Sequence, residues 1–67
     1  MKEILRQLIM KADAFLDGAV ECEDTRNLQN ALEELQETFL TEGDNETSQY
    51  LWRAIANLSE ALSNFTR

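Results

Sequence analysis

The chain has 67 residues, with thirteen carboxylates against six bases, no histidine, no proline, one cysteine and a net charge of −7. A chain this short forms one domain, residues 1–67, whose core supplies only about 3 to 5 kcal/mol of stability. A single cysteine excludes an internal disulfide, and without histidine or a second thiol no usual zinc site can be assembled. Self-association is the remaining aid to stability, so we expect a homodimer.

The charge excludes further classes of protein. A net charge of −7 repels phosphate, so we expect no direct binding to nucleic acid and no docking to an anionic membrane. No apolar run approaches the roughly 20 residues that cross a bilayer, and charges interrupt the first apolar segment, which argues against a signal peptide. We therefore expect a cytoplasmic protein without cofactors, whose partner is a protein with a neutral or basic surface.

The first segment, about residues 2–18, has the apolar repeat of an amphipathic helix. At about 100° per residue its apolar side chains cover about 160°, which is wide enough to contact two neighbouring helices. Gly18 predicts the end of the helix, and the polar run at 21–24 predicts a joint. The repeat has 4-3-4-3-4 spacing and consists of Met1, Leu5, Leu8, Ala12, Phe15 and Ala19.

The second predicted helix covers about residues 25–41. Asp24 or Thr25 is expected to begin it, because either side chain can accept a hydrogen bond from the free amides of a first turn. Its apolar stripe is narrow, and the opposite face carries carboxylates that ordinarily form a solvated surface. The stripe repeats at 4-3-4 spacing and consists of Leu28, Leu32, Leu35 and Phe39.

The third predicted helix, about residues 46–66, carries two stripes. One is apolar, with 4-3-4-3 spacing from Leu51 to Phe65. The other is uncharged and rotated from the first by roughly 60° to 80°. Its small side chains let another backbone come close, and its one large aromatic offers an anchor, although that aromatic could equally cover the rim of the chain's own core. The residues of this uncharged seam are Trp52, Ala56, Ser59 and Ser63.

Three helical patterns joined by short polar segments define the fold class, and no segment has the pattern of a strand. Sequential helices with short joints pack as antiparallel neighbours. The sequence therefore predicts a small all-α, three-helix bundle with up-down-up topology.

Catalytic chemistry has little support in the sequence. The absence of histidine removes the commonest general base and metal ligand. The acidic neighbours of Cys22 are expected to disfavour the thiolate that nucleophilic work requires. The run at 42–46 lacks the alternating oxygen ligands of a calcium loop. We therefore predict that the protein is not an enzyme.

The acidic charge is concentrated in the middle of the chain. Residues 12–46 carry eleven acids against one base, whereas residues 1–11 and 47–67 are each slightly basic. Such a band can steer a basic partner, can imitate the phosphate line of a nucleic acid, or can simply keep the protein soluble.

Two functional hypotheses follow. The first is a non-enzymatic protein–protein interaction module, or small regulatory accessory protein, that works as a homodimer and binds its partner through the uncharged seam. The alternative is a phage- or plasmid-type inhibitor that imitates nucleic acid and blocks a DNA- or RNA-binding protein. Its acidic surface would consist of Glu33, Glu34, Glu37, Glu42, Asp44 and Glu46.

Overall fold

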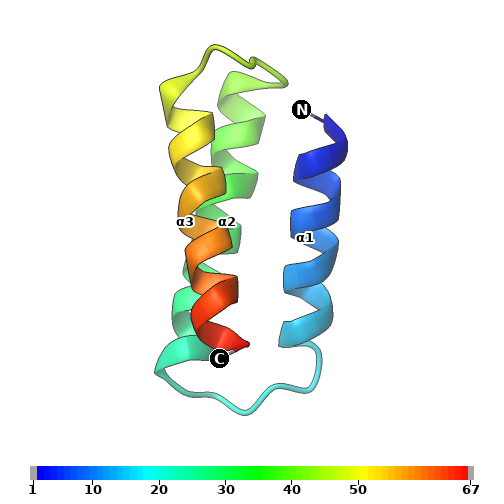
Figure 1. The fold of residues 1–67 in the computed structure, drawn as a ribbon, viewed down its shortest axis with the longest axis vertical. Coiled ribbons are helices and arrows are strands. Elements are labelled where there is room, and N and C mark those ends of the chain that lie inside the picture. The colour runs from blue at the N-terminus through cyan, green and yellow to red at the C-terminus, as the bar shows by residue number, and fades with distance from the viewer. Residues whose placement is uncertain (1, 67) are drawn as a thin grey trace.

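Residues 2–66, the part of the chain that the computed structural model describes, form three α-helices packed against each other. Helix α1 spans Lys2–Leu16, α2 spans Glu23–Glu42 and α3 spans Gln49–Phe65. Successive helices run in opposite directions along a body of 35 × 19 × 17 Å (Figure 1). The predicted all-helical class and three-helix bundle are confirmed, and these residues include no strand.

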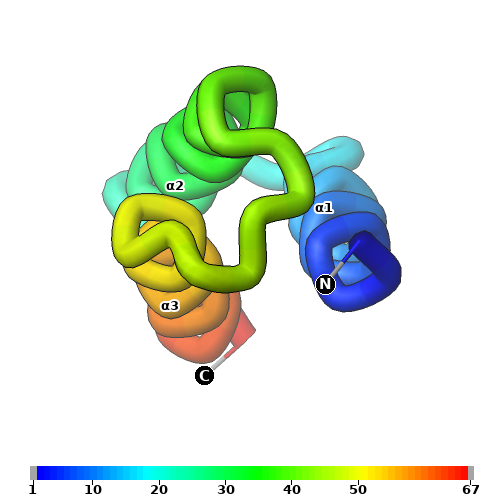
Figure 2. The backbone as a smooth tube through the Cα atoms, turned by 90° about the horizontal axis from the view of Figure 1, so that it is seen from above, coloured from blue at the N-terminus to red at the C-terminus, as the bar shows by residue number. Residues whose placement is uncertain are grey.

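The hydrophobic core lies mainly between α2 and α3. These two helices lie side by side, and α1 stands further from both (Figures 1 and 2). Accordingly α1 contributes only two of the buried apolar residues. The buried core consists of Leu5, Ala12, Leu28, Ala31, Leu32, Leu35, Leu51, Ala54, Ile55, Leu58 and Leu62.

Helix α1 packs against both neighbours through partly buried side chains, as the width of its stripe predicts. Ile9 and Leu16 are partly buried and pack against the core. At its C-terminal end, the Phe15 ring contacts Phe65 of α3, with centroids 5.7 Å apart and a tilt of 58° between the planes. Tilted aromatic pairs of this kind are favourable, so this contact fastens the lower end of α1.

The first helix is shorter than predicted, ending at Leu16 instead of residue 18. The Asp17 amide still donates to the Asp13 carbonyl at 3.0 Å, but the Ala19 amide turns back to the Leu16 carbonyl at 3.1 Å. Gly18, with φ of +77°, makes this turn. A left-handed backbone is easiest for glycine, so Gly18 lies beyond the helix instead of within it.

The second helix starts earlier than predicted and spans Glu23–Glu42 instead of 25–41. Its N-cap is Cys22, whose side chain makes no capping hydrogen bond, and neither Asp24 nor Thr25 caps the helix. Thr25 lies inside the first turn, buried, and its hydroxyl donates to the Val20 carbonyl at 2.7 Å. The threonine therefore fastens the joint to the helix instead of beginning it.

The third helix starts later than predicted and spans Gln49–Phe65 instead of 46–66. Ser48 is the N-cap, since its hydroxyl oxygen accepts a hydrogen bond from the Leu51 amide at 3.2 Å. Asn45 instead forms a turn, because its side-chain oxygen accepts from the Thr47 amide at 3.1 Å and from the Thr47 hydroxyl at 2.7 Å. Short polar side chains stabilise turns and N-caps alike, and here Asn45 stabilises the turn while Ser48 caps the helix.

Candidate protein-binding site

Trp52, the aromatic member of the predicted seam, lies in the first turn of α3 with 45% of its surface exposed. Its indole N–H donates to the Glu46 carbonyl at 2.6 Å. The ring therefore holds the joint between α2 and α3 against the start of α3. The exposed part of the ring is accessible for a contact with another protein.

The other members of the seam lie on the same side of α3. Ala56, Ser59 and Ser63 are all exposed, and at about 100° per residue they fall with Trp52 within about 60° of the helix surface. Ser59 and Ser63 line two hollows between α3 and α1, whereas Trp52 and Ala56 lie outside these hollows. The structure therefore divides the predicted seam into two residues in a groove and two beside it.

The two hollows join into one groove, because both are lined by Leu8, Lys11 and Ser59. Their volumes are about 320 and 270 Å³. We call this feature the α1–α3 groove. Its lining residues are Ile4, Gln7, Leu8, Lys11, Ile55, Ser59, Leu62, Ser63 and Thr66.

The α1–α3 groove differs in charge from the chain as a whole. Lys11 is the one charged side chain among its lining residues, all of which lie within residues 2–66, although the chain carries −7. The remaining lining is aliphatic, hydroxyl or amide. The groove can therefore hold an apolar helix face and pair one carboxylate with Lys11.

The α1 side of this groove was not identified from the sequence. Leu8 belongs to the predicted apolar repeat of the first helix, whereas Ile4 and Lys11 do not. Ile4 is 49% exposed. The width of the apolar arc of the first helix is the sequence feature that indicates a second contact surface on it.

The predicted acidic surface is divided between α2 and the joint that follows it. Glu33, Glu34 and Glu37 are exposed on α2, and Glu34 accepts a long hydrogen bond of 3.5 Å from the Asn57 side chain of α3. Glu42, at the end of α2, is half-buried and accepts a hydrogen bond from the Ser48 hydroxyl. The two remaining acids, Asp44 and Glu46, are exposed in the joint.

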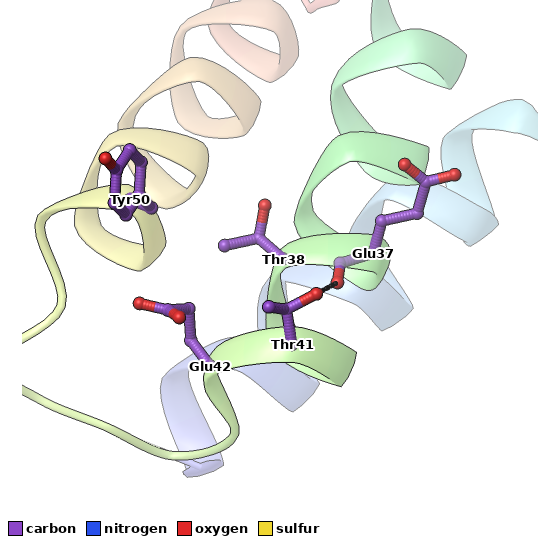
Figure 3. Close-up of a pocket in the computed structure, with 5 residues that line it drawn as sticks. All are labelled: Glu37, Thr38, Thr41, Glu42 and Tyr50. Carbon is purple, nitrogen blue, oxygen red and sulfur yellow. Dashed lines mark hydrogen bonds between the residues drawn. The ribbon is translucent and has the colours of Figure 1, made fainter.

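Part of this surface is hollowed. A depression of about 370 Å³ lies between the end of α2 and the start of α3, and it is lined by Glu37, Thr38, Thr41, Glu42 and Tyr50 (Figure 3). The Thr41 hydroxyl donates to the Glu37 carbonyl at 3.2 Å and is thus committed to its own helix. The Glu37 carboxylate points away from Tyr50 and Glu42 in Figure 3, so the two acids do not converge on one point.

Cys22 differs from the prediction for its thiol. Hydrogen bonding with the Thr25 side chain, whose hydroxyl oxygen lies 3.2 Å from the sulfur, and with the Thr25 backbone lowers the pKa of the exposed Cys22 thiol below its ordinary value. The charge of Asp24 acts in the opposite direction but is the smaller effect. The direction of this shift is opposite to the one expected from the acidic neighbours of Cys22, because hydrogen bonding with Thr25 has the larger effect.

No helix within residues 2–66 is long and apolar enough to cross a bilayer. The same residues contain no group of three or more acidic, cysteine or histidine side chains arranged to hold a metal ion. Comparison with known proteins finds no matching family model, and no curated protein or solved structure with significant similarity to the chain.

Proposed function

We propose that the protein is a non-enzymatic interaction module that self-associates and binds a helix of another protein along the α1–α3 groove. The observation that carries the proposal is the groove itself, in which four aliphatic side chains lie among small polar ones and Lys11 is the one lining charge. Apolar grooves between helices commonly receive an amphipathic helix, whose apolar side chains at i, i+3, i+4 and i+7 fill the trough. Ser59 and Ser63 favour close approach because their side chains are small.

The chemistry of the bound helix follows from the lining of the groove. Its apolar face would contact Ile4, Leu8 and Ile55, and a carboxylate near its middle would pair with Lys11. Elsewhere the partner should be neutral or basic, since the chain as a whole carries −7 and repels an acidic protein.

The test uses immobilised protein to capture the partner from an extract of the source cell. Ser59→Arg places a long side chain across the groove, and Asn30→Arg places the same side chain at an exposed position of α2. We expect the retained protein to be lost from the Ser59→Arg variant and kept by the Asn30→Arg variant. Retention of the same protein by all three forms would contradict the groove as the binding site.

A second variant tests the charge in the groove. Lys11→Glu should weaken binding of the identified partner by about five- to tenfold, because one charge-assisted pair becomes a repulsive one. Lys11→Gln should have a smaller effect, since it removes the attraction without adding repulsion. Titration of the purified partner by calorimetry measures both changes.

The alternative function, an acidic inhibitor of a nucleic-acid-binding protein, has support in the depression beside Glu37 and Glu42, where a basic side chain could enter (Figure 3). It predicts a different response to mutation. Replacement of Glu33, Glu34 and Glu37 together by lysine should abolish capture of such a target. The Ser59→Arg variant should still capture it. The groove proposal predicts the reverse result for both variants, so the two functions are separable in one experiment.

A further inference from the structure

The outer face of α1 carries an unusual order of charges. Five exposed residues step along the helix at 4-4-3-4 spacing and, at about 100° per residue, fall within about 80° of its surface. Two bases come first, an apolar side chain stands in the middle, and two acids come last. We call this row the α1 stripe, and it consists of Lys2, Arg6, Met10, Asp13 and Asp17.

This order does not stabilise the helix that carries it. Bases near the N-terminus and acids near the C-terminus of a helix oppose its dipole. Glu3 is the acid of the first turn of α1, and the last turn contains no base. Asp17 follows the last residue of α1 and continues its hydrogen-bond pattern, because the Asp17 amide donates to the Asp13 carbonyl. Asp13 and Asp17 therefore both lie near the C-terminus of the helix, where negative charge is unfavourable. The charge order therefore calls for a reason outside the helix itself.

An apolar hollow lies beside the same row. It has a volume of about 250 Å³ between α1 and α2, and its lining residues are Lys2, Leu5, Arg6, Ile9, Met10 and Phe39. Met10, in the middle of the stripe, is 64% exposed. This face of the chain thus has an apolar centre with bases towards one end of α1 and acids towards the other.

From this pattern we propose that the α1 stripe is the self-association surface, and that it pairs with the α1 stripe of a second copy in antiparallel orientation. A two-fold axis perpendicular to the helix, passing between Ile9 and Met10, reverses the order of charges. It places Arg6 opposite Asp13 of the second copy and Lys2 opposite Asp17. Both pairs occur twice, as the symmetry of an isologous dimer requires.

Charge complementarity favours a second copy of the chain as the partner of the α1 stripe, and it favours the antiparallel orientation. A parallel pairing of the two helices would place bases against bases and acids against acids, which is unfavourable. Antiparallel pairing makes four opposite-charge contacts around an apolar centre formed by Met10 and Ile9 from each copy. The same contacts place the acids of one copy near the N-terminus of the other helix, where they offset its dipole.

The size of the contact sets the expected affinity. Fifteen helical residues extend about 22 Å at a rise of about 1.5 Å each, so one helix pair forms an interface at the small end of the stable range. We therefore expect a dissociation constant on the order of micromolar to tens of micromolar. Sedimentation equilibrium between about 5 µM and 1 mM covers this range.

The experiment exchanges charges between two variants. Arg6→Asp leaves acids at both paired positions, and Asp13→Arg leaves bases at both, so each variant alone should self-associate at least about tenfold more weakly than the wild type. An equimolar mixture of the two restores both opposite-charge pairs and should form a heterodimer with nearly wild-type affinity. The double variant Arg6→Asp, Asp13→Arg should also associate as a homodimer.

Helix content measured by circular dichroism provides the control for folding, because all the substituted side chains are exposed. Loss of association in both single variants without recovery in the mixture would overturn antiparallel pairing. Dimers of unchanged affinity in both single variants would overturn the stripe as the interface but leave self-association in place.

The inference rests on the self-association part of the proposed function. Its failure can be distinguished from a failure of partner binding along the α1–α3 groove. A wild-type protein that stays monomeric to 1 mM would overturn the inference and the self-association part together. Partner binding along the α1–α3 groove is tested independently through Ser59→Arg, because the groove and the α1 stripe share no residue.

Discussion

At the scale of single residues, Thr25 has the most consequential side chain outside the apolar core. It is 4% exposed, and its hydroxyl donates to the Val20 carbonyl at 2.7 Å across the joint between α1 and α2. Replacement by valine keeps the shape and leaves a carbonyl in the joint without its donor. We expect Thr25→Val to lower the free energy of unfolding by roughly 1 to 2 kcal/mol.

Urea denaturation measures this loss, and Thr41→Val is the matched control. The Thr41 hydroxyl also donates to a helix carbonyl, that of Glu37 at 3.2 Å, but the residue is exposed and water can replace the bond. The control should therefore change stability by less than about 0.5 kcal/mol. Equal losses in the two variants would contradict the importance of the buried bond.

The same threonine determines the reactivity of Cys22. Because hydrogen bonding with Thr25 lowers the pKa of the Cys22 thiol, we expect a larger fraction of thiolate near neutral pH than for an ordinary cysteine. The rate of alkylation by iodoacetamide should therefore rise with pH with a midpoint below that of an unstructured peptide. Thr25→Val should raise the midpoint, and Thr25→Ser, which keeps the hydroxyl, should leave it nearly unchanged.

At the scale of elements, the sequence predicts the middle of each helix better than its ends. Apolar spacing determines which face is buried, so the stripes from Leu28 to Phe39 and from Leu51 to Phe65 both face the core as predicted. Helix ends depend instead on which of several adjacent polar side chains makes a hydrogen bond. Asn45 and Ser48 both suit an N-cap, and only the three-dimensional structure shows that Asn45 is used in a turn.

The candidate site likewise has a part that periodicity predicts and a part that depends on the three-dimensional packing. The seam on α3 could be predicted, since Ser59 and Ser63 depend only on periodicity. The groove that they line could not, because it exists only where α1 stands off from α3, and that distance depends on packing. The anchoring of the α2–α3 joint by Trp52 was likewise hidden, because its acceptor is a backbone carbonyl, which no sequence pattern reveals.

The loose packing of α1 leads to a prediction about local stability. Only Leu5 and Ala12 of this helix are buried, against five residues of α3. Elements with few buried apolar contacts open locally at lower free energy than the core. We expect amides in the middle of α1 to exchange with deuterium at least about tenfold faster than those around Leu58. Equal protection of the two helices would show that α1 opens only with the whole molecule.

At the scale of the whole molecule, two electrostatic effects of opposite sign act on self-association. Each copy carries −7, so two copies repel one another as they approach. In the proposed antiparallel dimer, the α1 stripe would oppose this repulsion with opposite charges in direct contact. Salt screens both effects but over different ranges, because the repulsion acts across a body 35 Å long and the paired charges lie within a few ångströms.

This difference predicts that association passes through a maximum as salt is raised. At about 0.01 M the Debye length is about 30 Å, comparable to the molecule, and the net repulsion is felt in full. At about 0.15 M it is about 8 Å, so the repulsion is largely screened while adjacent pairs such as Arg6 with Asp13 of the second copy keep much of their attraction. At about 1 M it falls to about 3 Å, and the pairs weaken too. Sedimentation equilibrium at the three concentrations should therefore give the tightest dimer at the middle one, and affinity that only rises with salt would mean that apolar contact alone joins the copies.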